Sequence, residues 1–477
     1  MIPEYIKELK IAKYQCLTST LFFSRYFFKK RFNRKFVIGE HHKIISDVLD
    51  RVIKGELKKV IFNIAPRYGK TELAVKNFIA KGLAVNPSSR YIHLSYSDDL
   101  ALDNSDEVRE LIKSAEYQEM FPNVKIKPKS DSKKKWYTSE DGGVYATSAA
   151  GQVTGFGAGQ VDDEELNQMS NWLVGKDGQL FGGALIIDDP IKPEDADSDN
   201  IRERVNQRFD STIRNRVNSR NTPIIIIMQR LHEKDLCGYL IDQEPEEWTV
   251  ISLPCLKEDG TALWEFKHTV EELNKIKSNN KIVFERQYQQ SPKPLEGLMF
   301  PENELRYYKP SDLLKFESSI GYADIADEGE DNLSAPIGRN IGKDIYITDV
   351  VFCRENTGVT LPMVAETLKR NETKFIRVES NNMGAMFNRE LAKLVPNTQC
   401  FPAHSSSNKF TRILMDSEFI KRNCLFIHPS EQNAQYKSFM KELTSYLSNG
   451  KSKHDDAPDS MSGLAMFIRA MLPKYYL

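Results

Sequence analysis

The stretch that decides the fold runs from Ile64 to Thr71 and reads IAPRYGKT. It follows the apolar run VIFNI at 60–64, which predicts a buried strand, and it precedes a helical pattern over 70–83. Its last three residues match the end of the phosphate-binding motif G-x-x-x-x-G-K-S/T, but Ile64 stands where that motif has its first glycine. The strand–turn–helix context still favours a phosphate-binding turn, because backbone N–H groups and a helix N-terminus attract anions.

Each residue of this turn has a chemical role to offer. Gly69 allows the backbone to approach a phosphate, Lys70 reaches the β- and γ-phosphates, and Thr71 supplies a hydroxyl to Mg²⁺. In place of the missing glycine, Pro66 stiffens the turn and Arg67 adds a second positive charge facing the phosphates. Because Gly-Lys-Thr also occurs by chance, this interpretation needs a carboxylate partner.

A carboxylate partner follows another buried strand. The run ALII at 184–187 is followed by Asp188 and Asp189. In nucleotide hydrolysis one such acid holds Mg²⁺, and the other orients and deprotonates the attacking water. Paired acids can also simply cap a turn, but together with the loop they indicate an ATPase or GTPase. The sequence contains no guanine-reading N-K-x-D tetrapeptide, which favours ATP.

A polar pair ends a third strand. The run IIII at 224–227 leads to Gln229 and Arg230, and a polar residue beside the γ-phosphate can report hydrolysis to the rest of a domain. Apolar strands that alternate with helices indicate a parallel sheet covered on both faces. We therefore predict an α/β P-loop ATPase domain of the RecA/ASCE-like class.

The length of 477 residues favours two domains. We predict a basic, aromatic and helical arm at 1–37, the ATPase domain at 38–255, a linker at 256–300 and a second domain at 301–477. The second domain shows three predicted strands in succession, then alternating helices and strands as far as 401, and then helices to the end. This order is typical of an RNase H-like α/β nuclease fold.

Five acids of the second domain lie where such a nuclease needs them. Asp324 lies at its first strand, Glu379 ends a later strand, and Asp455, Asp456 and Asp459 open the last helix. In two-metal nucleases, acids from separate elements converge on ions about 4 Å apart. The three helix acids share a face, so more than one could reach the metals. An N-cap role for Asp455 or Asp456 is the alternative.

The composition is globular, with 40% hydrophobic and 28% charged residues. The net charge of −1 neither supports nor excludes a polyanionic partner. Basic residues gather at 29–35, 125–135 and 202–220, where they could contact DNA phosphates or be solvated faces. The six cysteines show no zinc spacing and read as reduced cytoplasmic thiols, and no apolar run is long enough to predict a membrane span.

These motifs resemble those of the large subunit of tailed-phage terminases, which are DNA-packaging ATPases with a nuclease. The similarity covers roughly residues 38–470, and its most specific part is LKKVIFNIAPRYGKTELA. The family's phosphate loop commonly reads Pro-Pro-Arg-x-Gly-Lys-Ser/Thr and lacks the first glycine. Further blocks in the family's order are GQVTGFG at 151–157, LIIDDPIKPEDADS at 185–198, IIIIMQRLHEKDLCG at 224–238 and FERQYQQSPKPLEG at 284–297.

The resemblance implies roles in the ATP site. Lys70 and Thr71 would bind the triphosphate and Mg²⁺, with Arg67 as an auxiliary contact. Asp188 would be the Mg²⁺ acid, and Asp189 would take the role of general base that glutamate more usually fills.

The resemblance also implies residues around that site. The helix at His42 would cover the adenine, and Gln229 with Arg230 would form the coupling motif. Many relatives carry an arginine where this chain has Phe156, so Arg214 or Arg216 would have to serve as the arginine finger. Residues 158–181 look like an insertion.

In the second domain the resemblance implies Asp324, Glu379 and Asp456 as the metal-binding nuclease acids, with Asp455 and Asp459 as close contenders. The implied cofactors are ATP and Mg²⁺, with Mn²⁺ supporting the nuclease. The implied partners are double-stranded DNA, a portal protein, a small terminase subunit and other copies of the chain in a pentameric ring, without a membrane.

The implied place is the host bacterial cytoplasm, transiently on the procapsid and not in the mature virion. Two other interpretations of the residues stay open. One is a cellular helicase- or repair-type ATPase-nuclease, and the other is a DNA-binding scaffold with an inactive nuclease domain.

Overall fold

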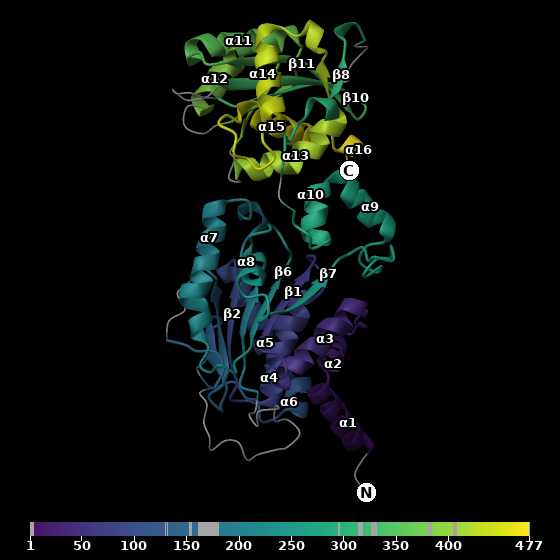
Figure 1. Ribbon diagram of the computed structural model, residues 1–477, viewed down its shortest axis with the longest axis vertical. Helices are drawn as coiled ribbons and strands as arrows, with labels where there is room; N and C mark the ends of the chain where they lie inside the picture. The colour runs from purple at the N-terminus through teal and green to yellow at the C-terminus, as the bar shows by residue number, and fades with distance from the viewer. Residues whose placement is uncertain are drawn as a thin grey trace. The chain divides into compact units, whose positions relative to one another are not determined.

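The computed structural model (Figure 1) describes residues 4–128, 130, 132–151, 155–160, 181–293, 296–312, 318–325, 332–379, 384–403 and 408–476. The chain divides into two compact units. The first comprises Met1–Ser278 and Ile282–Lys293, and the second comprises Asn279–Lys281 and Pro294–Leu477. The boundary at Lys293 falls inside the segment 256–300 that we predicted as a linker, so most of that segment packs with the first unit.

The first unit is built on a seven-stranded sheet whose order is β3-β4-β2-β5-β6-β1-β7. All neighbouring strands are parallel except β3, which is antiparallel to β4. The strands are β1 (Lys59–Ile64), β2 (Arg90–Ser95), β3 (Lys135–Tyr137), β4 (Gly143–Ser148), β5 (Leu185–Asp188), β6 (Ile224–Met228) and β7 (Thr249–Leu253). The order places β6 between β1 and β5, so the three predicted polar strand ends lie side by side at the carboxyl ends of these parallel strands.

Helices cover both faces of this sheet, because its central strands are apolar on both sides. Val60 and Phe62 of β1 belong to the core under α3 and α4, and Ile61 belongs to the core of the other face, under α7 and α8. The helices are α1 (Glu4–Thr18), α2 (Thr20–Phe32), α3 (Glu40–Ile53), α4 (Phe78–Val85), α5 (Asp98–Lys113), α6 (Ala115–Met120), α7 (Asp199–Arg208), α8 (Leu236–Gln243), α9 (Val270–Asn279) and α10 (Lys281–Val283).

The helices of the predicted arm, α1 and α2, are part of the first unit's core. Phe23 and Phe27 are fully buried there. The Asp50 carboxylate of α3 accepts hydrogen bonds from the Thr20 backbone N–H at 2.9 Å and from the Thr20 hydroxyl at 2.6 Å, and it forms an ion pair with the buried Lys81 of α4. This charged contact fixes the start of α2 to the two helices beneath it.

We expect Lys81→Met to destabilise the first unit by about 3–5 kcal/mol, because it leaves the Asp50 carboxylate buried without its cation. The double variant Asp50→Asn/Lys81→Met should recover most of that loss. The four tryptophans all precede residue 279, so urea unfolding followed by tryptophan fluorescence reports on the first unit. A double variant as unstable as Lys81→Met would contradict the pairing argument.

The second unit contains a mixed seven-stranded sheet with the order β13-β12-β9-β10-β11-β14-β8. The strands are β8 (Arg306–Tyr308), β9 (Ser318–Ala323), β10 (Leu333–Ile341), β11 (Asp344–Cys353), β12 (Phe375–Glu379), β13 (Gln399–Ala403) and β14 (Cys424–Ile427). Strands β9, β10 and β11 form an antiparallel meander, and β12 and β13 extend it in parallel beside β9. This is the predicted RNase H-like order, and the α/β fold class of both units is confirmed.

The helices of the second unit are α11 (Thr357–Arg370), α12 (Gly384–Leu394), α13 (Lys409–Asn423), α14 (Ala434–Ser445), α15 (Asp456–Met471) and α16 (Pro473–Tyr476). The expectation of helices alone after 401 is wrong at β14. Its four residues, CLFI, are too few for a period of 2 to be told from a helical one. Within the described residues, no helix is both long and apolar enough to cross a bilayer.

Candidate functional site

The phosphate-loop turn leaves β1 with two residues in the left-handed region. Arg67 has φ +61° and is exposed, and Gly69 has φ +77°. A Cβ atom on Gly69 would lie 2.9 Å from Nε2 of His42, so glycine is required there for both backbone and space. Pro66 lies at the start of the turn, and the side chain of Lys70 is buried.

The acids at the end of β5 meet the loop directly. The Lys70 ammonium lies 2.6 Å from Oδ1 of Asp189, and the Thr71 hydroxyl donates to Oδ2 of Asp188 at 2.6 Å. Asp189 itself has φ +45°. Burial, and then the Asp189 carboxylate, raise the pKa of Asp188 to about 6.

The donors present here fit a hydrated Mg²⁺ ion. The second carboxylate oxygen of Asp188, Oδ1, is buried and has no hydrogen-bond partner in the described part of the chain. A buried orphan oxygen next to the Thr71 hydroxyl is what a hard cation with oxygen ligands requires. Thr71 and Asp188 are therefore the residues that could hold the ion.

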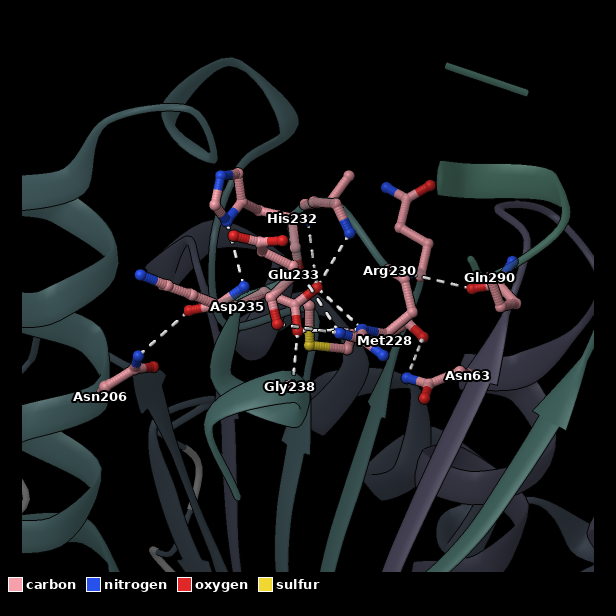
Figure 2. A network of polar contacts seen from close by, with 12 residues as sticks. Asn63, Asn206, Met228, Arg230, His232, Glu233, Asp235, Gly238 and Gln290 are labelled. Carbon is pink, nitrogen blue, oxygen red and sulfur yellow. Dashed lines mark hydrogen bonds and ion pairs between the residues drawn. The ribbon is translucent and has the colours of Figure 1, made fainter. Parts of the chain in front are cut away.

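The end of β6 adjoins these acids. The Gln229 backbone N–H approaches Oδ1 of Asp189 at 3.4 Å, and Oε1 of Gln229 is buried without a described partner. Arg230 has a different place (Figure 2). Its Nε lies 3.0 Å from both oxygens of the buried Asp235, and its backbone N–H donates to Oε1 of Gln290 at 2.9 Å. The strand end is thus tied to the segment that leads to the second unit.

Two buried histidines support the loop from behind. Nε2 of His41 donates to the Tyr68 carbonyl at 3.0 Å, and Nδ1 of His42 accepts from the Gly39 N–H at 2.8 Å. Both rings pack against Trp264, with ring centroids 5.2 Å and 4.9 Å away. Burial chiefly lowers the pKa of His41 to about 4 and that of His42 to about 3, so both are neutral. His42 thus packs behind the phosphate loop, and sequence reasoning missed His41 and Trp264.

We expect the stability of the first unit to fall as pH drops from about 6.5 towards 4, because the unfolded chain protonates His41 and the folded chain does not. His41→Gln keeps a donor for the Tyr68 carbonyl and removes this titration. Between pH 8 and pH 5 it should therefore lose about 2 kcal/mol less stability than the wild type. Urea unfolding at both pH values, monitored by tryptophan fluorescence, measures the difference. Equal losses of stability in the two proteins would contradict the conclusion that His41 is neutral in the folded chain.

The two candidate finger arginines lie at the opposite edge of the sheet. Arg214 pairs with Asp210 at 2.8 Å and also with Glu244, which in turn binds Lys59, the first residue of β1. Across a six-residue strand this edge is about 17 Å from the phosphate loop. The backbone carbonyl of Arg216 accepts from the Ala158 N–H near the start of β2. Neither arginine thus reaches the loop within its own chain.

The region of the predicted insertion is only partly described. Phe156, which stands where many members of the family that the chain resembles carry arginine, is buried and stacks on Tyr145. Residues 161–180 of the predicted insertion 158–181 lie outside the described residues, and Phe181 packs into the core beside Phe78.

In the second unit, three carboxylates converge. Asp324, Glu379 and Asp459 each place an oxygen within 4.8 Å of the others. The register of β9 and β12 explains why the first two lie together. Ala323 pairs with Val378 in parallel strands, so the residues that follow them, Asp324 and Glu379, lie side by side at the carboxyl ends of these strands. Asp459 comes from the first turn of α15. Three converging carboxylates are a donor set that fits Mg²⁺ or Mn²⁺.

The other two helix acids are outside this group of three carboxylates. Oδ2 of Asp456, which the resemblance ranked first on this helix, accepts from the Asn332 backbone N–H at 2.8 Å and its side-chain amide at 3.1 Å. Asp455 stands at the N-cap position of α15, but its side chain makes no cap hydrogen bond. The structure therefore places Asp459, and not Asp456, among the three converging carboxylates.

Cations of α13 face the cluster. Lys409 Nζ lies 2.7 Å from Asp455, 3.4 Å from Asp459 and 4.0 Å from Asp324. Arg412 binds both carboxylate oxygens of Asp459, at 2.7 Å and 2.9 Å. Burial holds the pKa of Asp324 well above its usual range, with the Asp459 carboxylate as the next cause, and burial also raises the pKa of Asp459. Sequence reasoning missed both cations, because nothing near 409 in the sequence signals proximity to 459.

Comparison with known proteins places the fold. No protein-family model matches the chain, and no curated protein sequence matches it. Among solved structures, the chain is similar to the large terminase of a thermophilic bacteriophage, with a TM-score of 0.51 and 11% identity over 88% of this chain and 98% of that one. The complex of that phage's large terminase with ATP-γ-S gives a TM-score of 0.50 and 10% identity over 87% and 97%. At this identity the likeness is one of fold.

Proposed function

We propose that the chain is the large subunit of a phage terminase, an ATPase that drives double-stranded viral DNA into a procapsid and a nuclease that cuts concatemeric DNA. The observation that carries the proposal is the presence of two built sites in one chain. The first unit has Lys70 and Thr71 against Asp188 and Asp189, and the second has a carboxylate cluster on an RNase H-like sheet. The fold likeness to a large terminase supports it.

In the ATP site, the ion pair between Lys70 and Asp189 has a functional consequence. A triphosphate would attract the Lys70 ammonium, and Asp189 would then be free to orient and deprotonate the attacking water. Thr71 and Asp188 would hold Mg²⁺, which supplies charge neutralisation on the phosphates. Arg67 would add a contact from the exposed side of the turn.

Other residues would assist this reaction. Gln229, whose backbone contacts Asp189, would sense the γ-phosphate. A movement of Gln229 would shift the neighbouring Arg230, and the ion pair of Arg230 would transmit that shift to Asp235. His42 would hold the loop beside the adenine. An arginine finger from Arg214 or Arg216 would have to act on the site of a neighbouring subunit, since each lies far from the loop of its own chain.

In the nuclease site, Asp324, Glu379 and Asp459 would hold the divalent ions, Mg²⁺ or Mn²⁺, which activate water and stabilise the leaving oxygen when bound. Asp456 would hold Asn332 by its hydrogen bonds and so fix the start of β10, where Ser334 pairs with Asp324. The proposed partners are double-stranded DNA, a portal protein, a small terminase subunit and further copies in a pentameric ring, in the host bacterial cytoplasm.

The direct test is to assay the purified chain for ATP hydrolysis and for Mg²⁺- or Mn²⁺-dependent cleavage of plasmid DNA. Both activities should be present and separable by mutation, and the absence of both would overturn the proposal. The helicase alternative requires a second RecA-like domain, whereas the second unit has an antiparallel meander in its sheet. The scaffold alternative predicts no metal binding by the acid cluster.

A further inference from the structure

Lys409, the first residue of α13, lies among the nuclease acids. Its ammonium is within 4.0 Å of carboxylate oxygens from Asp324, Asp455 and Asp459. Two of these acids belong to the cluster that fits a divalent ion. A single ammonium therefore occupies the side of the cluster where two of the proposed metal ligands converge.

The electrostatics explain why a cation is held there. Several largely buried carboxylates within a few ångströms repel one another unless a positive charge compensates them. Arg412 compensates Asp459 through two hydrogen bonds, and its guanidinium is largely buried. The side chain of Lys409 is more than one-third exposed and sits on a flexible four-carbon stem, so this cation can leave without unfolding the helix.

We propose that Lys409 is an internal counter-ion that competes with the divalent metal for Asp324 and Asp459. The inference rests on the proposed nuclease function and adds a regulation to it. In the metal-free chain the ammonium neutralises the cluster, and metal binding requires its displacement. Lys409 thus lowers the metal affinity of the nuclease site. By linkage, bound metal must weaken the ion pairs between Lys409 and the acids to the same extent.

The test is Mn²⁺ binding to the full chain. Binding at the nuclease site is measured as the Mn²⁺ that the wild type binds and Asp459→Asn does not. Lys409→Gln should bind this Mn²⁺ about tenfold more tightly or better, because a charge at this distance shifts carboxylate equilibria by one to three powers of ten. Lys409→Arg keeps the charge and should stay close to the wild type. Lys421→Gln is the matched control, since Lys421 lies on the same helix but pairs with Glu304 and Glu418.

Unchanged or weaker Mn²⁺ binding by Lys409→Gln would overturn the inference while leaving the nuclease proposal intact. If Asp459→Asn removes no bound Mn²⁺, the proposed metal site itself is wrong. If Lys409→Gln does not fold, amine labelling of the wild type replaces it. Added Mn²⁺ should increase the labelling of Lys409 and leave that of Lys421 unchanged, and equal labelling of Lys409 with saturating Mn²⁺ would also overturn the inference.

Discussion

Lys70→Ala is expected to abolish ATP hydrolysis and to leave DNA cleavage intact. The ammonium of Lys70 is buried and lies 2.6 Å from Asp189. In the proposed reaction it binds the phosphates of ATP. Removing a preorganised cation from a charged transition state costs about 100-fold or more in rate. Phosphate release measures the ATPase, and Mn²⁺-dependent nicking of plasmid DNA measures the nuclease.

Lys59→Ala is the matched control for this variant. Lys59 lies at the opposite end of the same strand and pairs with Glu244 and Glu247, so its loss should leave the ATPase within about twofold of the wild type. Tryptophan fluorescence confirms that both variants are folded in the first unit. Normal ATP turnover by Lys70→Ala would show that the loop is not the nucleotide site.

Asp459→Asn is expected to abolish DNA cleavage and to leave ATP hydrolysis unchanged. The substitution keeps the size of the side chain and removes the charge that the metal cluster needs. The loss of one carboxylate ligand should lower the cleavage rate by about 100-fold or more, because the metals supply several kcal/mol of transition-state stabilisation. Plasmid cleavage at saturating Mn²⁺ is the measurement.

Asp456→Asn is the informative comparison, because the resemblance favoured Asp456 as the ligand. Its carboxylate accepts two hydrogen bonds from Asn332, so its loss should cost about 1–2 kcal/mol of stability and reduce cleavage far less than Asp459→Asn. If Asp456→Asn destroys cleavage and Asp459→Asn does not, the ranking of the two acids must be reversed.

The residues of the candidate nucleotide site could be predicted to lie together, because each of them follows or ends a strand of one parallel sheet. Gly-Lys-Thr follows a buried strand, and Asp188–Asp189 and Gln229 follow two others, so parallel pairing alone brings their ends to one edge. Asp324 and Glu379 were predictable for the same reason, since β9 and β12 run in parallel and end together.

The remaining features depend on distances that the sequence does not encode. The choice among Asp455, Asp456 and Asp459 depends on the rotation of α15 about its axis, which the packing of α13 and β10 sets. The contact of Lys409 with residues 46 and 50 positions later arises only in the folded unit. Strands β3, β7 and β8 were missed because they lie at the edges of their sheets, and β14 was missed because it has only four residues, so hydrophobic periodicity is weak in all of them. Strand β4, GVYATS, was missed because its glycine, threonine and serine interrupt the apolar run that the other buried strands show.

The left-handed backbone at Asp189 bears on why this chain has an aspartate where the family it resembles more usually has glutamate. Aspartate enters this region of conformational space more readily than longer side chains do, because its short polar group can hydrogen-bond locally. A glutamate would gain a methylene of reach and lose that tolerance at φ +45°. The shorter acid therefore fits the sharp exit of the chain from β5, at a position where it also pairs with Lys70.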